Sequence, residues 1–208
     1  MRTLVLFGGG IGILTLGIAL TIESGLGASP FDALLVGLSE QVGLTVGSWE
    51  VLLALLMIGC NSLLSRRRPE FEGLLTAFIT GIGIDLWLWL LRPLIDPGLW
   101  IGQLACFGAG LIVVGLGISL YLHAQFAPMP LDRLTLVLQT LTGLNLFVTR
   151  SGLYFIFLIA AFVVRGPIGL GTLLTVCLGG LILHTSMPLT GRALDRLQRQ
   201  AKATDPPA

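Results

Sequence analysis

Charged side chains are scarce in this chain. Lysine, arginine, aspartate and glutamate make up 11% of its 208 residues, whereas 54% are hydrophobic. A soluble domain carries about 25% charged residues, because they cover its surface. A net charge of only +1 also gives no basic surface for nucleic acid. Together with a mean hydropathy of +0.93, this composition excludes an ordinary soluble enzyme. It predicts an integral protein of the lipid bilayer with several spans.

The chain also lacks the common signatures of cofactor chemistry. Its three cysteines lie inside apolar runs and form no CxxC pair, so we interpret them as small hydrophobic residues. No G-x-x-x-x-G-K-S/T phosphate loop, no G-x-S-x-G and no H-E-x-x-H occurs. The sequence therefore predicts no metal, no cofactor, no use of ATP and no enzymatic activity.

Six runs with little or no charge have the length of a membrane span. They cover residues 3–22, 47–65, 73–91, 99–122, 147–164 and 168–189, and a span takes about 20 residues. Two shorter segments, 30–41 and 130–141, reach only about 18 Å as helices, which is roughly half of a bilayer. We expect one all-α, polytopic membrane domain over residues 1–208.

The two halves of the chain are related by an internal repeat. A shift of 100 residues produces 10 identities across residues 16–44, where about three are expected by chance. Among them Pro30 falls on Pro130 and Asp32 on Asp132. Each half is predicted to contain a long span, a half-length helix and two further spans. Repeat one covers about 3–92, repeat two about 99–189, and a tail follows at 190–208.

The number of crossings decides how the repeats are oriented. If each short segment enters the membrane and returns, each half crosses three times and the second half is inverted. With a cytoplasmic N-terminus, ten of the twelve Lys and Arg residues then lie inside, and only Arg92 and Arg165 lie outside, as the positive-inside rule requires. The alternative, eight crossings in a 4+4 arrangement, places the arginines at 66–68 outside. We prefer six crossings, with both termini in the cytoplasm.

Polar residues recur at matching positions of the two halves. A carboxylate at the bilayer centre costs about 2.5–3.5 kcal/mol, so it is rarely kept there without a role. The candidates for substrate binding are Ser29 and the matched pairs Asp32 and Asp132, Glu23 and His123, and, after a one-residue slip, Asp85 and His184. Glu50 and Arg150 also match, but they lie beside aromatic residues. We predict that these two anchor their helices at the membrane interface.

Each candidate also has a purely structural interpretation. Ser29, Pro30 and Asp32 have the order of a capping box that opens a helix, so Asp32 could serve only as a cap. Asp85 and His184 could serve only as hydrogen-bonding groups between helices. As a relay, His184 would suit proton transfer because the ordinary pKa of histidine is about 6.5. The sequence leaves these alternatives open.

Residues 25–32 and 43–49, with the pattern GLG-x-SP-x-D followed by GL-S/T-x-G-x-W, resemble the bacterial YczE/YyaS family of integral membrane proteins. The resemblance implies a multi-pass protein of the bacterial inner membrane. It supports Ser29, Pro30 and Asp32 as defining positions. It implies no particular substrate or reaction.

These features favour a small secondary transporter or permease with a midplane site at the repeat interface. Carboxylates at helix N-termini neutralise the preference of those ends for anions, so we expect a small polar or cationic metabolite, with proton coupling as an option. The alternative is a non-transporting membrane partner or scaffold for an enzyme or transporter complex. Homo-oligomers and a membrane partner protein are both compatible with the sequence. Catalysis on a lipid is the least favoured interpretation.

Overall fold

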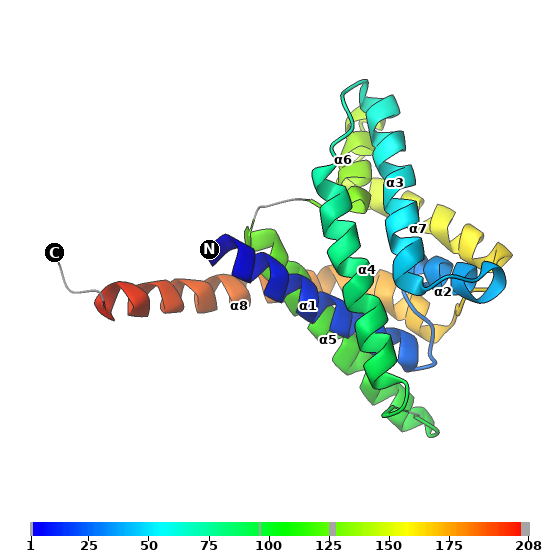
Figure 1. Ribbon diagram of the computed structural model, residues 1–208, viewed down its shortest axis with the longest axis horizontal. Helices are drawn as coiled ribbons and strands as arrows, with labels where there is room; N and C mark the ends of the chain where they lie inside the picture. The colour runs from blue at the N-terminus through cyan, green and yellow to red at the C-terminus, as the bar shows by residue number, and fades with distance from the viewer. Residues whose placement is uncertain (1, 96, 125–127, 205–208) are drawn as a thin grey trace.

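The computed structural model describes residues 2–95, 97–124 and 128–204, which contain helices and no strand (Figure 1). The helices are α1 (Arg2–Glu23), α2 (Pro30–Val42), α3 (Val46–Ser65), α4 (Glu72–Leu91), α5 (Trp100–Ala124), α6 (Pro130–Thr142), α7 (Leu146–Val163) and α8 (Leu170–Thr204). Equivalent helices of the two halves follow one another in the same order, as the repeat predicts.

Five helices, α1, α3, α4, α5 and α7, are long and apolar enough to cross a membrane. Helix α8 bends by 41° between Leu170–Ile182 and His184–Arg192, and it supplies a sixth span if the bent pair is counted as one. Its C-terminal part extends away from the other helices in Figure 1. The prediction of an all-helical, polytopic membrane protein is confirmed, with five or six helices of spanning length.

The two half-length helices begin where the sequence predicts, at Pro30 and Pro130. Proline is favoured in the first turn because it has no N–H to leave unpaired and its φ is already helical. Both helices have 13 residues, about 20 Å, and are too short to cross a bilayer. They end at Gly43 (φ 95°) and Gly143 (φ 70°), because glycine tolerates the positive φ that stops a helix.

The N-terminus of α2 has the predicted cap. The Ser29 hydroxyl accepts a hydrogen bond from the Asp32 backbone N–H at 3.2 Å. The second copy lacks this device, since Met129 at the same position provides no side-chain cap. All residues from Pro30 to Gly37 are buried, so the first half of α2 lies inside the helix assembly.

Helices α1 and α5 pack closely and run antiparallel (Figure 1). Their closest approaches, where a glycine of one helix meets the other helix, pair Gly10 with Tyr121, Gly117 with Leu14, Gly17 with Val114 and Gly110 with Thr21. As the residue number rises along α1, it falls by the same amount along α5, which is the pattern of antiparallel helices. Small residues let the two backbones meet, as is usual between membrane helices.

Several of the remaining helix contacts recur in both halves, although the packing of α3 on α4 has no comparable counterpart between α7 and α8 among the described residues. Helix α1 packs on α4 as α5 packs on α8, and α2 packs on α7 as α6 packs on α3. Helix α2 also contacts α3, as α6 contacts α7. Each half-length helix is therefore held against the third helix of the other repeat.

The outer surface is rich in large apolar side chains. Leu63, Phe78, Trp89 and Phe162 are each more than half exposed. A soluble monomer rarely exposes an apolar surface of this extent, whereas lipid tails accept it. The exposed side chains therefore agree with a bilayer around the helices.

Candidate functional site

A buried acidic pair lies at the start of α2. Asp32 is 9% exposed, and Glu50, near the start of α3, is 7% exposed. The Ser29 hydroxyl donates to Asp32 Oδ2 at 2.6 Å. Glu50 lies in α3, which packs against α2, and it makes no hydrogen bond to any residue that the structure describes. We call Asp32 and Glu50 the carboxylate pair.

An ionic cluster lies at the start of α6. The Tyr121 hydroxyl donates to Asp132 Oδ2 at 2.6 Å, and Arg150 Nη2 lies 3.5 Å from Asp132 Oδ1. The same guanidinium donates to the Tyr154 hydroxyl at 3.3 Å and lies 5.5 Å from the centre of its ring. Asp132 therefore has a hydroxyl donor and a cation that neutralises it. We call Tyr121, Asp132 and Arg150 the ionic cluster.

These two groups occupy equivalent places in the repeat. Asp132 lies 100 positions after Asp32, and Arg150 lies 100 positions after Glu50. Each half therefore has a carboxylate near the start of its half-length helix and a charged residue near the start of the following helix. That residue is acidic in the first half and basic in the second. The carboxylate pair thus has an excess of negative charge that the ionic cluster lacks.

The other predicted site residues lie elsewhere. Asp85 Oδ1 accepts from the Gly47 backbone N–H at 2.8 Å, and Glu23 pairs with Arg92 at 3.1 Å. His184 is exposed. The structure therefore distributes the seven predicted residues over several places instead of gathering them around one centre.

Glu23 and His123 illustrate why matched residues separate. His123 is exposed, and its Nδ1 lies 2.7 Å from the Ser119 carbonyl oxygen one turn earlier in α5. Glu23 ends α1, and His123 lies near the end of α5. Because α1 and α5 run antiparallel, their C-terminal ends point in opposite directions, and the two residues lie at opposite ends of the helix pair.

We expect Asp85 to act mainly through the N-terminus of α3. Removing its carboxylate in Asp85→Ala should cost about 1.5–3 kcal/mol, the usual value of a hydrogen bond to a charged group. Asp85→Asn retains an oxygen acceptor and should keep most of that stability. Thermal unfolding of the detergent-purified protein, followed by circular dichroism, measures both. Equal losses in the two variants would contradict this role.

Three residues of these clusters are absent from the sequence-based candidates: Glu50, Tyr121 and Arg150. The prediction that Glu50 anchors α3 at the interface is wrong, because its side chain is buried. The 100-residue shift already matches Glu50 with Arg150, so the repeat contained a usable signal. Tyr121 matches Thr21, and no sequence pattern links it to Asp132.

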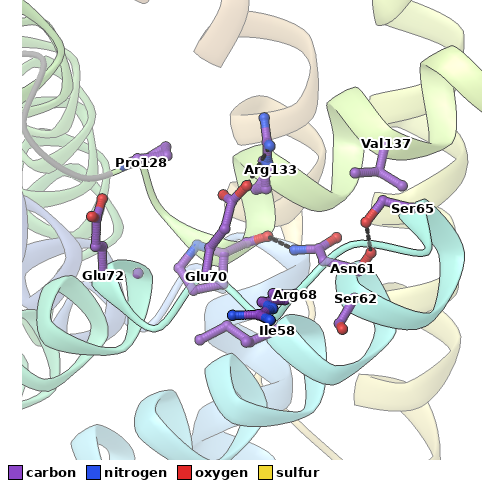
Figure 2. Close-up of a pocket in the computed structure, with 12 residues that line it drawn as sticks. Ile58, Asn61, Ser62, Ser65, Arg68, Glu70, Glu72, Pro128, Arg133 and Val137 are labelled. Carbon is purple, nitrogen blue, oxygen red and sulfur yellow. Dashed lines mark hydrogen bonds and ion pairs between the residues drawn. The ribbon is translucent and has the colours of Figure 1, made fainter.

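A polar pocket lies between α3, α6 and the chain that joins α3 to α4 (Figure 2). Arg133 Nη2 lies 2.5 Å from Glu70 Oε1 at this pocket. Asn61 Nδ2 donates to the Pro130 carbonyl at 3.2 Å, while its Oδ1 is buried and has no hydrogen-bond partner among the residues that the structure describes. Arg68 also lines the pocket. The pocket therefore places charged and amide side chains next to the N-terminus of α6.

The equivalent face of α2 is closed by small residues. At the equivalent positions, 100 residues away, Ala161 corresponds to Asn61 and Ala33 corresponds to Arg133. A Cβ atom added to Gly166 would lie only 2.1 Å from the Ala33 carbonyl oxygen, so the two backbones are in contact. The Ala28 N–H also donates to the Pro167 carbonyl at 3.2 Å. One half-length helix therefore borders a polar pocket, and the other is packed directly against its neighbours.

Metal binding finds no support in the part of the chain that the structure describes. No group of three or more His, Cys, Asp or Glu side chains there has the arrangement of a metal site. The carboxylate pair and the ionic cluster each contain too few such ligands.

Comparison with known proteins identifies relatives over most of the chain. The model of a family of unknown function, DUF6198, matches residues 1–188. The Bacillus subtilis protein YyaS is 54% identical over 186 residues, which cover 89% of this chain and 92% of the relative. The Bacillus subtilis membrane protein YczE is 36% identical over 202 residues, covering 95% and 93%. A Haemophilus influenzae protein is 28% identical over 166 residues, covering 79% and 73%. No solved structure matches.

Proposed function

The chain belongs to the DUF6198 family and is related to YyaS and the membrane protein YczE, and we propose that it is a small secondary transporter. The resemblance indicated by the loop motif is thereby confirmed. In this proposal the protein moves a small polar or cationic metabolite across the bilayer and catalyses no covalent reaction. The proposal rests on the charged residues near the starts of both half-length helices, which are buried in the first half and partly exposed in the second.

We further propose that the two halves form an inverted repeat, an arrangement that is typical of transporters. Transporters with such repeats place half-helix ends near the midplane, where the two repeats meet. Two observations agree with inversion here: α1 and α5 run antiparallel, and each half-length helix packs on the third helix of the other half. A two-fold axis in the membrane plane that relates the two halves would produce both the antiparallel packing and the exchanged contacts. With α2 and α6 re-entrant, each half contributes three crossings.

The charges at the two sites favour a cationic cargo. A helix N-terminus attracts anions, but Asp32 and Asp132 occupy those ends in α2 and α6. Asp132 already has Arg150 as a partner, whereas the carboxylate pair has no cation of its own among the described residues. A substrate with an ammonium group would supply the missing positive charge at Asp32 and Glu50.

The distribution of arginine supports the orientation. With cytoplasmic termini, the arginines at 66–68 face the cytoplasm, while Arg92 and Arg165 lie on the other side. The pocket in Figure 2 borders the chain at 68–73, so it becomes the cytoplasmic approach to α6. The close packing of Ala33 on Gly166 then forms the opposite, closed face. We propose the bacterial inner membrane as the location, since the relatives named above come from bacteria.

Transport by purified protein in liposomes tests the proposal. We expect uptake of at least one member of a panel of radiolabelled primary, secondary and quaternary amines. Asp32→Asn and Asp132→Asn should each reduce that uptake at least about tenfold, the effect of about 1.4 kcal/mol. Glu40→Gln is the matched control, since Glu40 lies in α2 but is exposed, and it should transport normally.

The alternatives predict different results. A scaffold predicts no uptake by any variant and a protein that co-purifies with the chain. If uptake occurs but is unchanged in Asp32→Asn and Asp132→Asn, the site assignment is wrong. Conversion of membrane lipids by the purified protein would favour catalysis instead.

A further inference from the structure

We propose that Asp32 and Glu50 share one proton, and that this proton is the coupling ion of the transporter. The second clause rests on the proposed function, whereas the first rests on the burial of both carboxyl groups and on the equivalent pair in the second repeat. The steps below concern the burial of the pair, its counterpart in the other repeat, and the charges around it.

Burial makes two negative charges at this place unfavourable. Both residues are at least nine-tenths buried, and the helices that carry them, α2 and α3, pack against each other. Low dielectric strengthens the repulsion between like charges and removes the water that would stabilise them. The single hydroxyl of Ser29 donates to Asp32, so it stabilises one carboxylate and leaves Glu50 without a donor. One proton on the pair removes the repulsion, and such a proton belongs to the pair as a whole.

The second repeat provides an internal comparison. At the position of Glu50 it has Arg150, whose guanidinium lies 3.5 Å from the equivalent carboxylate of Asp132. The same backbone arrangement therefore accommodates a positive charge opposite the aspartate. In the first repeat no described side chain places a positive charge at this position, so a bound cation would have to supply it. A bound proton supplies it without additional ligands.

A metal ion fits this place less well than a proton. Calcium takes six to eight oxygen ligands, and magnesium requires nearly octahedral geometry. The pair and Ser29 offer the oxygen atoms of three side chains, and no metal-binding group of His, Cys, Asp or Glu occurs among the described residues. A proton requires only the two carboxyl groups.

The charged residues of the neighbouring helices do not replace the proton. Helices α1, α3 and α7 pack against α2, and α4 and α6 pack against α3. The charged side chains of these elements that have described contacts are engaged elsewhere: Glu23 with Arg92, Asp85 with the Gly47 amide, Asp132 with Arg150, and Arg133 with Glu70. Neither Asp32 nor Glu50 has an ion pair among the residues that the structure describes.

The proton explains how the cargo would be coupled. When an ammonium group binds the Asp32 carboxylate, its charge replaces that of the proton. The O–H bond of Glu50 then breaks, and the proton passes to water. The two carboxyl groups together with their bound cation, first the proton and then the ammonium group, carry the same net charge before and after the step. Cargo and proton therefore exclude one another and move in opposite directions across the membrane.

Infrared spectroscopy of the purified protein tests the shared proton without any transport. We expect the carbonyl band of a protonated carboxylic acid at neutral pH, and its loss as the pH is raised. Glu50→Gln should remove the band, and Asp32→Asn should shift it or change its pH dependence. Glu40→Gln, in the exposed part of α2, should leave it unchanged. These amides are close in shape to the acids and remove the repulsion, so folding should be retained.

The absence of the band in the unmodified protein, or a band that Glu50→Gln and Asp32→Asn leave unchanged, would overturn the shared proton. Coupling is tested with methylammonium in proteoliposomes: an outward-directed flow of cargo should be matched by inward proton movement. If the protein shows the band but its rate of amine uptake is the same with and without an imposed pH gradient, the coupling role is overturned. If no amine is transported while the band behaves as expected, the proposed function fails and the proton site stands.

Discussion

One methyl group at Gly117 should destabilise the protein, whereas the same group at Gly108 of the same helix should stabilise it. A Cβ atom at Gly117 would lie 2.4 Å from the backbone nitrogen of Leu14 and 2.5 Å from its Cα atom. The obstacle is backbone, so α1 and α5 would have to move apart. We expect Gly117→Ala to cost about 1–3 kcal/mol, the usual range for overpacking.

The control lies two and a half turns away in α5. Nothing lies within 4 Å of a Cβ atom at Gly108. Gly108→Ala therefore adds only helix propensity and should stabilise by up to about 1 kcal/mol. Unfolding of both variants in one detergent, followed by circular dichroism, measures the difference. Shifts of the same sign in both variants would contradict close antiparallel packing of α1 and α5.

Loss of the Arg150 guanidinium should leave the Asp132 carboxylate without a cation. Removing one member of a buried pair can cost about 3–5 kcal/mol. Here the Arg150 and Asp132 side chains are 37% and 29% exposed, so water screens part of the interaction. We expect Arg150→Gln to destabilise by about 1–3 kcal/mol. The Tyr121 hydroxyl remains as a donor and limits the loss.

The double variant separates charge from packing. Asp132→Asn with Arg150→Gln removes both charges and should recover part of the stability, since contacting residues are coupled by about 0.5–3 kcal/mol. Arg165→Gln is the control, because Arg165 is exposed and has no ion pair among the described residues. Denaturant unfolding of the four proteins yields the coupling energy. Additive effects of the two single changes would argue against the ionic cluster.

The asymmetry between the repeats bears on both proposals. Two copies of one sequence unit have diverged at the position near the start of the third helix, to Glu50 in one and Arg150 in the other. A structural cap would not require opposite charges at this place. A transporter that keeps one half-site neutral and exchanges a cation at the other would account for them. The residues that line the pocket also differ between the halves, since Asn61 in the first half corresponds to Ala161 in the second.

Local features of the chain were sufficient to predict the half-length helices. Pro30 and Ser29 start α2, and Gly43 ends it, through effects that act within one turn of the backbone. The length and apolarity of the spans depend only on composition along the chain. The repeat, too, is visible without coordinates. For this reason the element order and most helix bounds could be predicted.

Tertiary structure alone decided which polar groups meet. A helix prediction does not contain the rotation and direction of one helix against another, and these select the partners. Antiparallel packing of α1 and α5 separates Glu23 from His123, although the repeat matches them. Packing of α3 on α4 assigns Asp85 to the Gly47 amide. The burial of Glu50 beside Asp32 arises in the same way, because it depends on how α3 lies against α2.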